Sequence, residues 1–151
     1  MVDTVEILAQ VESHAMSSGL FETVNLHEPK KKPGNHLTAA VWVQSVAPDP
    51  EASGLASTSA VFVFNLRVFT NMLQEPQDAI DPKMLAAVDR MMTLYSGDFT
   101  LGGNVMGIDL LGMAGVPLSA DAGYITQDGT LYRVMTITLP VLVANAWTQT
   151  A

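Results

Sequence analysis

The sequence predicts an α+β fold, in which a mostly antiparallel β-sheet is flanked by two main helices. Two stretches of the chain carry apolar residues at helical spacing, one at the N-terminus and one near the middle. Other stretches alternate between two kinds of side chain, as strands with two different faces do. The order is helix, strands, helix, strands, with no repeat and no low-complexity linker, which predicts one domain over residues 1–151.

The first helix is expected over residues 2–18. Asp3 lies where the positive end of the helix dipole favours a carboxylate, and Gly19 is a suitable stop after the last turn. The apolar positions expected to face the core are Val5, Leu8, Val11 and Ala15.

Three strands are expected next. Residues 20–26 form a short one, and residues 37–46 and 58–70 form a pair of longer ones. The segment 47–57 between the longer two is rich in turn-forming residues, so the two should pair as an antiparallel hairpin. The segment 27–36 holds two prolines, a glycine and three lysines, which predicts a loop.

The second helix is expected to begin at Asp81, with its side chain as the N-cap and Pro82 in the first turn, and to end at Gly97. Its apolar stripe is Met84, Leu85, Val88, Met91, Met92 and Tyr95. This stripe is expected to pack on the sheet as core; the alternative is a partner-binding groove, which methionine also suits.

The last third of the chain is expected to be mainly β-structure. Asp128 and Gly129 predict a tight hairpin turn, followed by a strand over residues 131–139. Pro140 is expected to disrupt that strand, leaving residues 141–147 as an extended or edge segment. Further candidate strands are 99–101, 105–113 and 122–126.

The composition combines little charge with much apolar surface. Charged residues make up 15% of the chain, and the mean hydropathy is +0.26. A well-filled core explains part of this, but the balance favours a permanent subunit interface, because obligate interfaces resemble a core cut in half. The net charge of −8 argues against adhesion to phosphates, and no apolar run reaches the ~20 residues that span a bilayer.

No enzyme motif is present, so no catalytic or cofactor-binding residue and no cofactor is expected, and the protein is expected not to be an enzyme. His27, Glu28 and His36 share one loop, but their spacing matches no metal-binding pattern and lysines lie between them. Solvated histidines are therefore expected rather than a metal site. His14 is expected to be a surface or interface side chain.

Contacts with partners are expected from the two long loops and the C-terminal segment. The lysine run is either a solvated loop tip or a docking point for an acidic neighbour. An apolar terminal strand can add to a neighbour's sheet, so removal of residues 141–151 is expected to abolish assembly and leave a folded monomer. The candidate interface residues are Lys30, Lys31, Lys32, His36, Leu55, Val141, Val143 and Trp147.

Six segments spread over nearly the whole chain carry a likeness to a known family, and none of them holds a catalytic signature. They are residues 53–60, 66–82, 95–103, 109–112, 122–124 and 131–139. Through these segments the chain resembles the tail terminator proteins of long-tailed, siphovirus-type phages of actinobacteria.

The resemblance implies a structural virion protein: a sheet flanked by helices that forms a homo-oligomeric ring, usually a hexamer. The ring would lie at the head-proximal end of the tail tube, end tube polymerisation and join the tail to the head-side connector. Its partners would be copies of itself, the tail tube protein and the connector or neck protein, with assembly in the host cytoplasm. DNA would pass through without specific binding, as an acidic conduit allows, and no membrane is involved.

Two alternatives to a tail terminator remain open at this point. One is another structural protein, either a head–tail neck or connector protein or a tail tube subunit, because these share small α+β scaffolds and ring assembly. A tube subunit polymerises into long cylinders, whereas a terminator stops at rings. A small hydrolytic or binding enzyme is the third reading, and the absence of its motifs argues against it.

Overall fold

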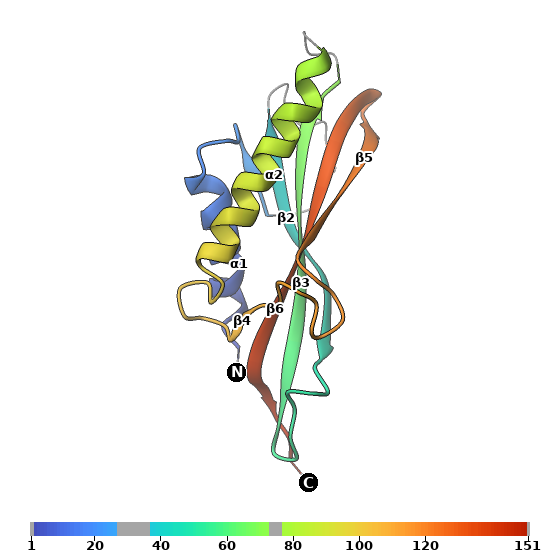
Figure 1. Cartoon of the computed structure of the whole chain (residues 1–151). Helices are drawn as coiled ribbons and strands as arrows, with labels where there is room; N and C mark the ends of the chain where they lie inside the picture. Colours follow the sequence, from blue (N-terminus) through green and yellow to red (C-terminus); the bar gives the residue numbers. More distant parts are fainter. Residues whose placement is uncertain (1, 27–36, 73–76, 151) are drawn as a thin grey trace.

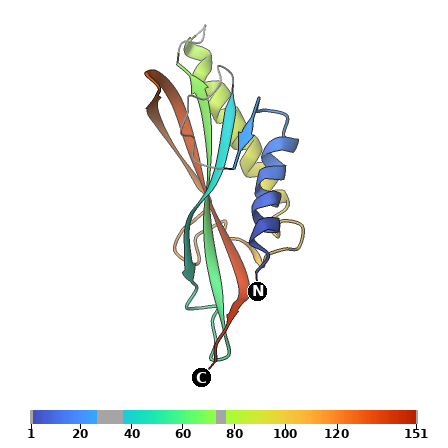
Figure 2. The same cartoon turned by 180° about the vertical axis from the view of Figure 1, so that it is seen from behind.

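The computed structural model describes residues 2–26, 37–72 and 77–150. Within them the chain is a mixed α+β protein with two α-helices and a six-stranded, mostly antiparallel sheet. Both helices lie on one side of the sheet (Figures 1 and 2). The α+β class and the two flanking helices predicted from the sequence are therefore confirmed.

The N-terminal helix α1 spans Thr4–Ser17. The Asp3 side chain caps it by accepting a 3.1 Å hydrogen bond from the backbone N–H of Glu6, and Gly19 ends it at a φ of +72°. The residues that α1 buries are Ile7, Val11 and Ala15. Val5 was expected in this stripe, but it is 79% exposed because the true stripe runs through Ile7.

The second helix α2 spans Ile80–Gly97, after a single 3-10 turn, η1, at Gln77–Ala79. The predicted end at Gly97 is confirmed, but the predicted Asp81 cap is wrong. The N-cap is Ala79, which caps with no side chain, and the Asp81 carboxylate instead accepts a 2.9 Å bond from Arg133 Nε. A tertiary ion pair thus takes the place of a local cap.

Most of the expected α2 stripe lies in the core. Tyr95 is fully buried, while Leu85 is 62% exposed and lies outside the contact with the sheet. Ala87 is buried in its place, because the face of α2 that meets the sheet is turned towards Ala87 and away from Leu85. The buried residues of α2 are Ile80, Met84, Ala87, Val88, Met91 and Tyr95.

The strands β2 and β3 form the predicted long antiparallel hairpin. Strand β2 spans Thr38–Pro48 and β3 spans Ser57–Asn71, with a bulge between Val43 and Ser45. Strand β6, Thr130–Thr148, pairs with β3 along almost its whole length. This puts β3 and β6 at the centre of the sheet.

Three shorter strands complete the sheet. The order is β1–β2–β3–β6–β4, with β5 also paired to β6, and only the β1–β2 pair is parallel. β1 and β4 have two residues each. Their bounds are Val24–Asn25 for β1, Gly107–Ile108 for β4 and Ser119–Gln127 for β5.

Pro140 does not disrupt β6, contrary to the sequence-based expectation. It sits opposite Val63 of β3, and its carbonyl oxygen accepts a 2.9 Å bond from the N–H of Asp109, on the side away from β3. In an antiparallel strand the N–H and C=O of one residue point the same way. The missing N–H of Pro140 therefore faces Asp109 rather than β3, and no hydrogen bond between β3 and β6 is lost.

Much of the β-structure expected in residues 99–113 is absent. Residues 99–101 form turns, with Leu101 buried at a φ of +48°. Of residues 105–113 only β4 is a strand. The turn at Asp128 and Gly129 is confirmed, since both residues have positive φ, as a type I′ turn requires.

The main core lies between the helices and the centre of the sheet. Alternate residues of β3 and β6, such as Leu66 and Ile137, meet Val11 and Tyr95 there. A smaller cluster of Ala40, Phe69, Tyr132 and Val134 lies on the strands themselves. At one end the β2–β3 hairpin and the end of β6 extend past both helices (Figures 1 and 2).

Candidate assembly surfaces

The part of the sheet that extends past the helices is a three-stranded arm. It consists of the end of β2, the turn at residues 49–56, the start of β3 and residues 143–149 of the C-terminal strand and tail. Leu55 is 98% exposed at the turn, and Trp147 is 41% exposed on the C-terminal strand. The arm therefore offers two large apolar side chains away from the core.

Side-chain hydrogen bonds hold the arm in one conformation. The Ser59 hydroxyl donates to the carbonyl of Ala52 over 2.8 Å and accepts from the N–H of Asn145 over 3.0 Å. Gln149 then closes the arm, because its side-chain nitrogen donates to the carbonyl of Gly54 over 2.9 Å. A surface ordered in this way loses little conformational entropy when it binds a partner.

One edge of β2 is open. β1 pairs with β2 only at Ala39 and Ala40, and within the described residues no strand pairs with the remainder of that edge. Residues 42–48 read Trp-Val-Gln-Ser-Val-Ala-Pro and carry no charge. Monomeric proteins guard such an edge with charged side chains, prolines or bulges. Here the bulge between Val43 and Ser45 and the proline at position 48 interrupt the edge, but residues 42–48 offer no charged side chain.

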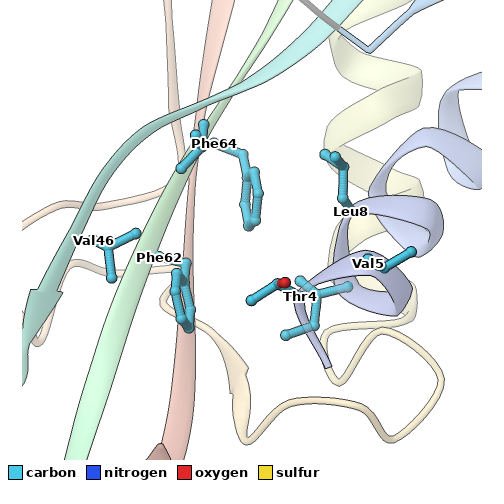
Figure 3. Close-up of a pocket in the computed structure, with 8 residues that line it drawn as sticks. Thr4, Val5, Leu8, Val46, Phe62 and Phe64 are labelled. Atoms are coloured by element: carbon cyan, nitrogen blue, oxygen red, sulfur yellow. The ribbon is translucent and has the colours of Figure 1, made fainter. Parts of the chain in front are cut away.

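An apolar groove lies beside this edge, between α1 and the sheet. Figure 3 shows Thr4, Val5 and Leu8 of α1 on one side and Val46, Phe62 and Phe64 on the other. The volume of the groove is about 270 Å³. Ile7 and Val43 complete the lining, which contains no charged residue.

The segment between β4 and β5, residues 109–118, forms an apolar loop. It crosses the face of the sheet opposite the helices (Figures 1 and 2). Leu111 is 86% and Met113 is 79% exposed. Sequence reasoning missed this surface because it read the apolar residues as a strand; the glycines at 112 and 115 among them were the signal for a loop.

The candidate interface residues fall into three groups. Lys30, Lys31, Lys32 and His36 lie outside the described residues. Leu55 and Trp147 are exposed on the arm, where a partner can reach them. Val141 and Val143 are buried in this subunit's own core, so their side chains offer no contact surface.

The C-terminal strand is paired within its own subunit and is not free to add to a neighbour's sheet. Val141 pairs with Phe62 on one side and with Ile108 on the other. Removal of residues 141–151 would take away part of a central strand, so the structure argues against the expectation that a folded monomer remains. β6 is an edge only beyond Leu142, along the arm.

His14 joins the two helices rather than lying free on the surface. Its Nε2 lies 2.9 Å from Oδ2 of Asp98, and its ring meets the Tyr95 ring edge-on at 5.6 Å between centroids. The N–H of Gly102 donates to the Asp98 carboxylate, and this bond, with the His14 imidazole, keeps the pKa of Asp98 below its usual value. These contacts are explained by the packing of α1 on α2.

Among residues 2–26, 37–72 and 77–150, no three His, Cys, Asp or Glu side chains are grouped so that they can hold a metal ion. The same residues include no helix with the length and apolarity to cross a bilayer. What the described surface offers is a rigid arm, an open strand edge, an apolar groove and an apolar loop.

The fold and these surfaces define an α+β protein with several exposed apolar surfaces. No protein-family model and no curated protein matches the chain.

Proposed function

We propose that the protein is a structural, non-enzymatic subunit that assembles with copies of itself into a ring. The ring is proposed to be the tail terminator of a long-tailed actinobacteriophage, usually six copies at the head-proximal end of the tail tube. There it ends tube polymerisation and joins the tail to the head-side connector or neck protein. DNA passes through it without specific binding.

The observation that carries the proposal is the uncharged edge of β2 beside the apolar groove. Residues 42–48 lack any charged side chain, and Val43 and Val46 are 52% and 48% exposed. An exposed strand edge of this kind pairs readily with other chains unless something covers it. In a ring, a neighbouring copy provides that cover permanently.

The distribution of apolar surface also supports a ring over a two-fold dimer. The groove lies on the helix side of the sheet, and the apolar loop lies on the opposite side. A two-fold dimer buries the same patch on both copies, whereas a head-to-tail contact buries two different patches and closes by rotation. Two unlike apolar patches on opposite sides suit the second arrangement.

The arm and the acidic charge fit the remaining parts of the proposal. The arm projects past the helices, so it can reach a tube or connector subunit above or below the ring. The net charge of −8 per copy disfavours adhesion to the DNA backbone. Both features are compatible with a conduit joined to a partner at one end.

Native mass spectrometry and electron microscopy of the purified protein test the proposal. The expected result is a closed ring with a fixed number of 16.1 kDa copies, six by the resemblance, that does not grow with concentration. Added to polymerising tail tube protein of the same phage, the ring should stop elongation. Long cylinders of the pure protein would instead identify a tube subunit, and rings that bind only the connector would identify a neck protein.

A further inference from the structure

The apolar loop and the groove lie back to back at the same level of the sheet. The N–H of Asp109, where the loop begins, donates to the carbonyl of Pro140, which is paired with Val63 of β3. Phe62 and Phe64, the neighbours of Val63, point to the other face and line the groove. A single level of the molecule thus carries one apolar surface on each side.

The loop is held in shape by a buried carboxylate. Asp109 is 3% exposed, and its two oxygens accept bonds of 2.8 Å from the N–H groups of Met113 and Ala114. Gly112 has a φ of +77°, and an added Cβ there would lie 2.9 Å from the nitrogen of Pro117. These constraints fix the backbone that carries the exposed side chains of Leu111 and Met113.

The charge of the chain restricts where two copies can meet. Each copy carries a net −8, so copies repel one another except where their facing surfaces lack carboxylates. Residues 110–118 carry no charge, and neither do the eight residues that line the groove. Loop and groove are therefore two surfaces through which copies of this acidic chain can meet without bringing carboxylates together.

The groove also has room for the loop's side chains. At about 270 Å³ it is nearly twice the size of an engineered apolar cavity of ~150 Å³ that takes up benzene. Leu111 and Met113 are the most exposed of the loop's large hydrophobic side chains, at 86% and 79%. Two aliphatic side chains of this length suit the space between α1 and β2–β3.

We propose that the loop of residues 109–118 on one copy inserts Leu111 and Met113 into the α1–β2–β3 groove of the next copy. This rests on the proposed self-assembly and names its contact. Because loop and groove lie back to back, every copy donates a loop on one side and receives one on the other. Because they lie at the same level, successive copies meet without a step along the strands, so the contact can close into a ring.

Two variants test the two halves of the contact. Leu111→Asp places a charge on the loop, and Val5→Glu places one in the groove, in the first turn of α1 where a carboxylate suits the helix dipole. Each alone should weaken self-association at least about thirtyfold, the effect of losing one strong interface contact. Leu85→Glu adds the same charge at a position 62% exposed on α2 and should leave the ring intact.

Mixing the two variants gives the sharper result. The Leu111→Asp copy keeps an intact groove and the Val5→Glu copy keeps an intact loop, so a mixture has one working contact per pair. Native mass spectrometry should therefore show a 1:1 heterodimer from two monomeric variants. A mixture that stays monomeric would overturn the loop-in-groove contact.

Cysteine cross-linking keeps the proposal testable if a charged variant fails to fold. The chain has no cysteine, so the double variant Leu111→Cys, Val46→Cys should give a disulfide-linked ladder of copies under mild oxidation. Linked dimers from Leu111→Cys alone would show loop-to-loop contact and contradict the proposal. If both charged variants still form rings of the wild-type size, the loop-in-groove contact is wrong and the proposed function stands. If the wild-type protein itself is monomeric, both proposals are contradicted.

Discussion

The hydroxyl of Tyr95 donates a 2.9 Å hydrogen bond to the backbone carbonyl of Val11, and this bond joins α2 to α1 inside the core. Both residues are fully buried. The two helices are thus fixed to one another as well as to the sheet. Because α1 forms one wall of the groove, its contact with α2 also holds that wall in position.

Tyr95→Phe should lower the free energy of unfolding by about 1 kcal/mol, the typical net contribution of one hydrogen bond. The ring volume is kept, so no cavity forms. Urea denaturation followed by circular dichroism measures the change. An unfolding free energy equal to that of the wild type would mean that the bond contributes nothing to the contact between the helices.

The same residue predicts a loss of stability at alkaline pH. Burial raises the pKa of Tyr95, while tyrosine in the unfolded chain ionises near pH 10. The contribution is complete below about pH 10 and is lost above it, because only the unfolded state then releases the proton, at up to about 1.4 kcal/mol per pH unit. Tyr95→Phe should remove the contribution of one proton to the slope of unfolding free energy against pH above about pH 10. An unchanged slope would mean that Tyr95 is not the residue responsible.

Asp98 predicts a smaller effect at acid pH. The N–H of Gly102, with the nearby His14, lowers the pKa of Asp98, so its stabilising effect is present above the unfolded-state value of about 3.9 and is lost as the pH falls through the lowered value. Solvent screens this partly exposed group, so the loss should stay below about 1 kcal/mol. Asp98→Asn should remove it, as acid titration of the unfolding free energy would show.

Asp109→Asn should weaken assembly more than folding. The amide keeps one oxygen to accept a bond from Met113 or Ala114, but it loses the charge and the second acceptor. Ordering the loop then has to occur during assembly, which should raise the dissociation constant about tenfold for each 1.4 kcal/mol. Sedimentation across a concentration series measures this, and an unchanged constant would exclude a preorganised loop.

Gly112→Ala should destabilise the same loop through the backbone. A non-glycine residue at positive φ costs about 1–2 kcal/mol, and the added Cβ meets Pro117 at 2.9 Å. Gly97→Ala is the matched control, because a Cβ there meets nothing within 4 Å and its φ is not positive. It should be neutral or stabilising by up to about 1 kcal/mol. Equal unfolding free energies for the two variants would contradict the loop geometry.

Two C-terminal deletions separate the core from the arm. A chain ending at residue 140 loses Val141 and Val143 from the core and should not fold. A chain ending at residue 148 loses the Gln149 bonds to Gly54, Ala56 and Thr58 and should stay folded with a looser arm turn. In the chain that ends at residue 148, hydrogen exchange should rise at residues 54–58 and stay unchanged elsewhere. Global unfolding of this chain would contradict the separation of the arm from the core.

The elements that follow from local pattern were predictable from the sequence. The alternation in β3, the Asp128–Gly129 turn and the start and stop of α1 depend on residues that are neighbours in the chain. Asp81 shows where this ends, because its capping position is local while its partner Arg133 lies 52 residues away. Sequence spacing contains no information about that partner.

The contact surfaces were harder to predict for the same reason. Val141 looks like an exposed terminal segment in the sequence, but β3 and β4 pair with it from both sides. Val5 fits a core stripe by spacing, but it lines a groove because α1 turns Ile7 inwards instead. Which apolar residues remain exposed depends on how the helices and strands pack, and the low overall charge predicts only that some do.

The mass of the wild-type protein in solution, measured by native mass spectrometry over a wide concentration range, tests the central claim most directly. The account predicts one closed species, a fixed multiple of 16.1 kDa, that gives way to monomer on dilution without a series of growing intermediates. A protein that remains monomeric at every concentration, with its β2 edge and groove uncovered, would contradict it.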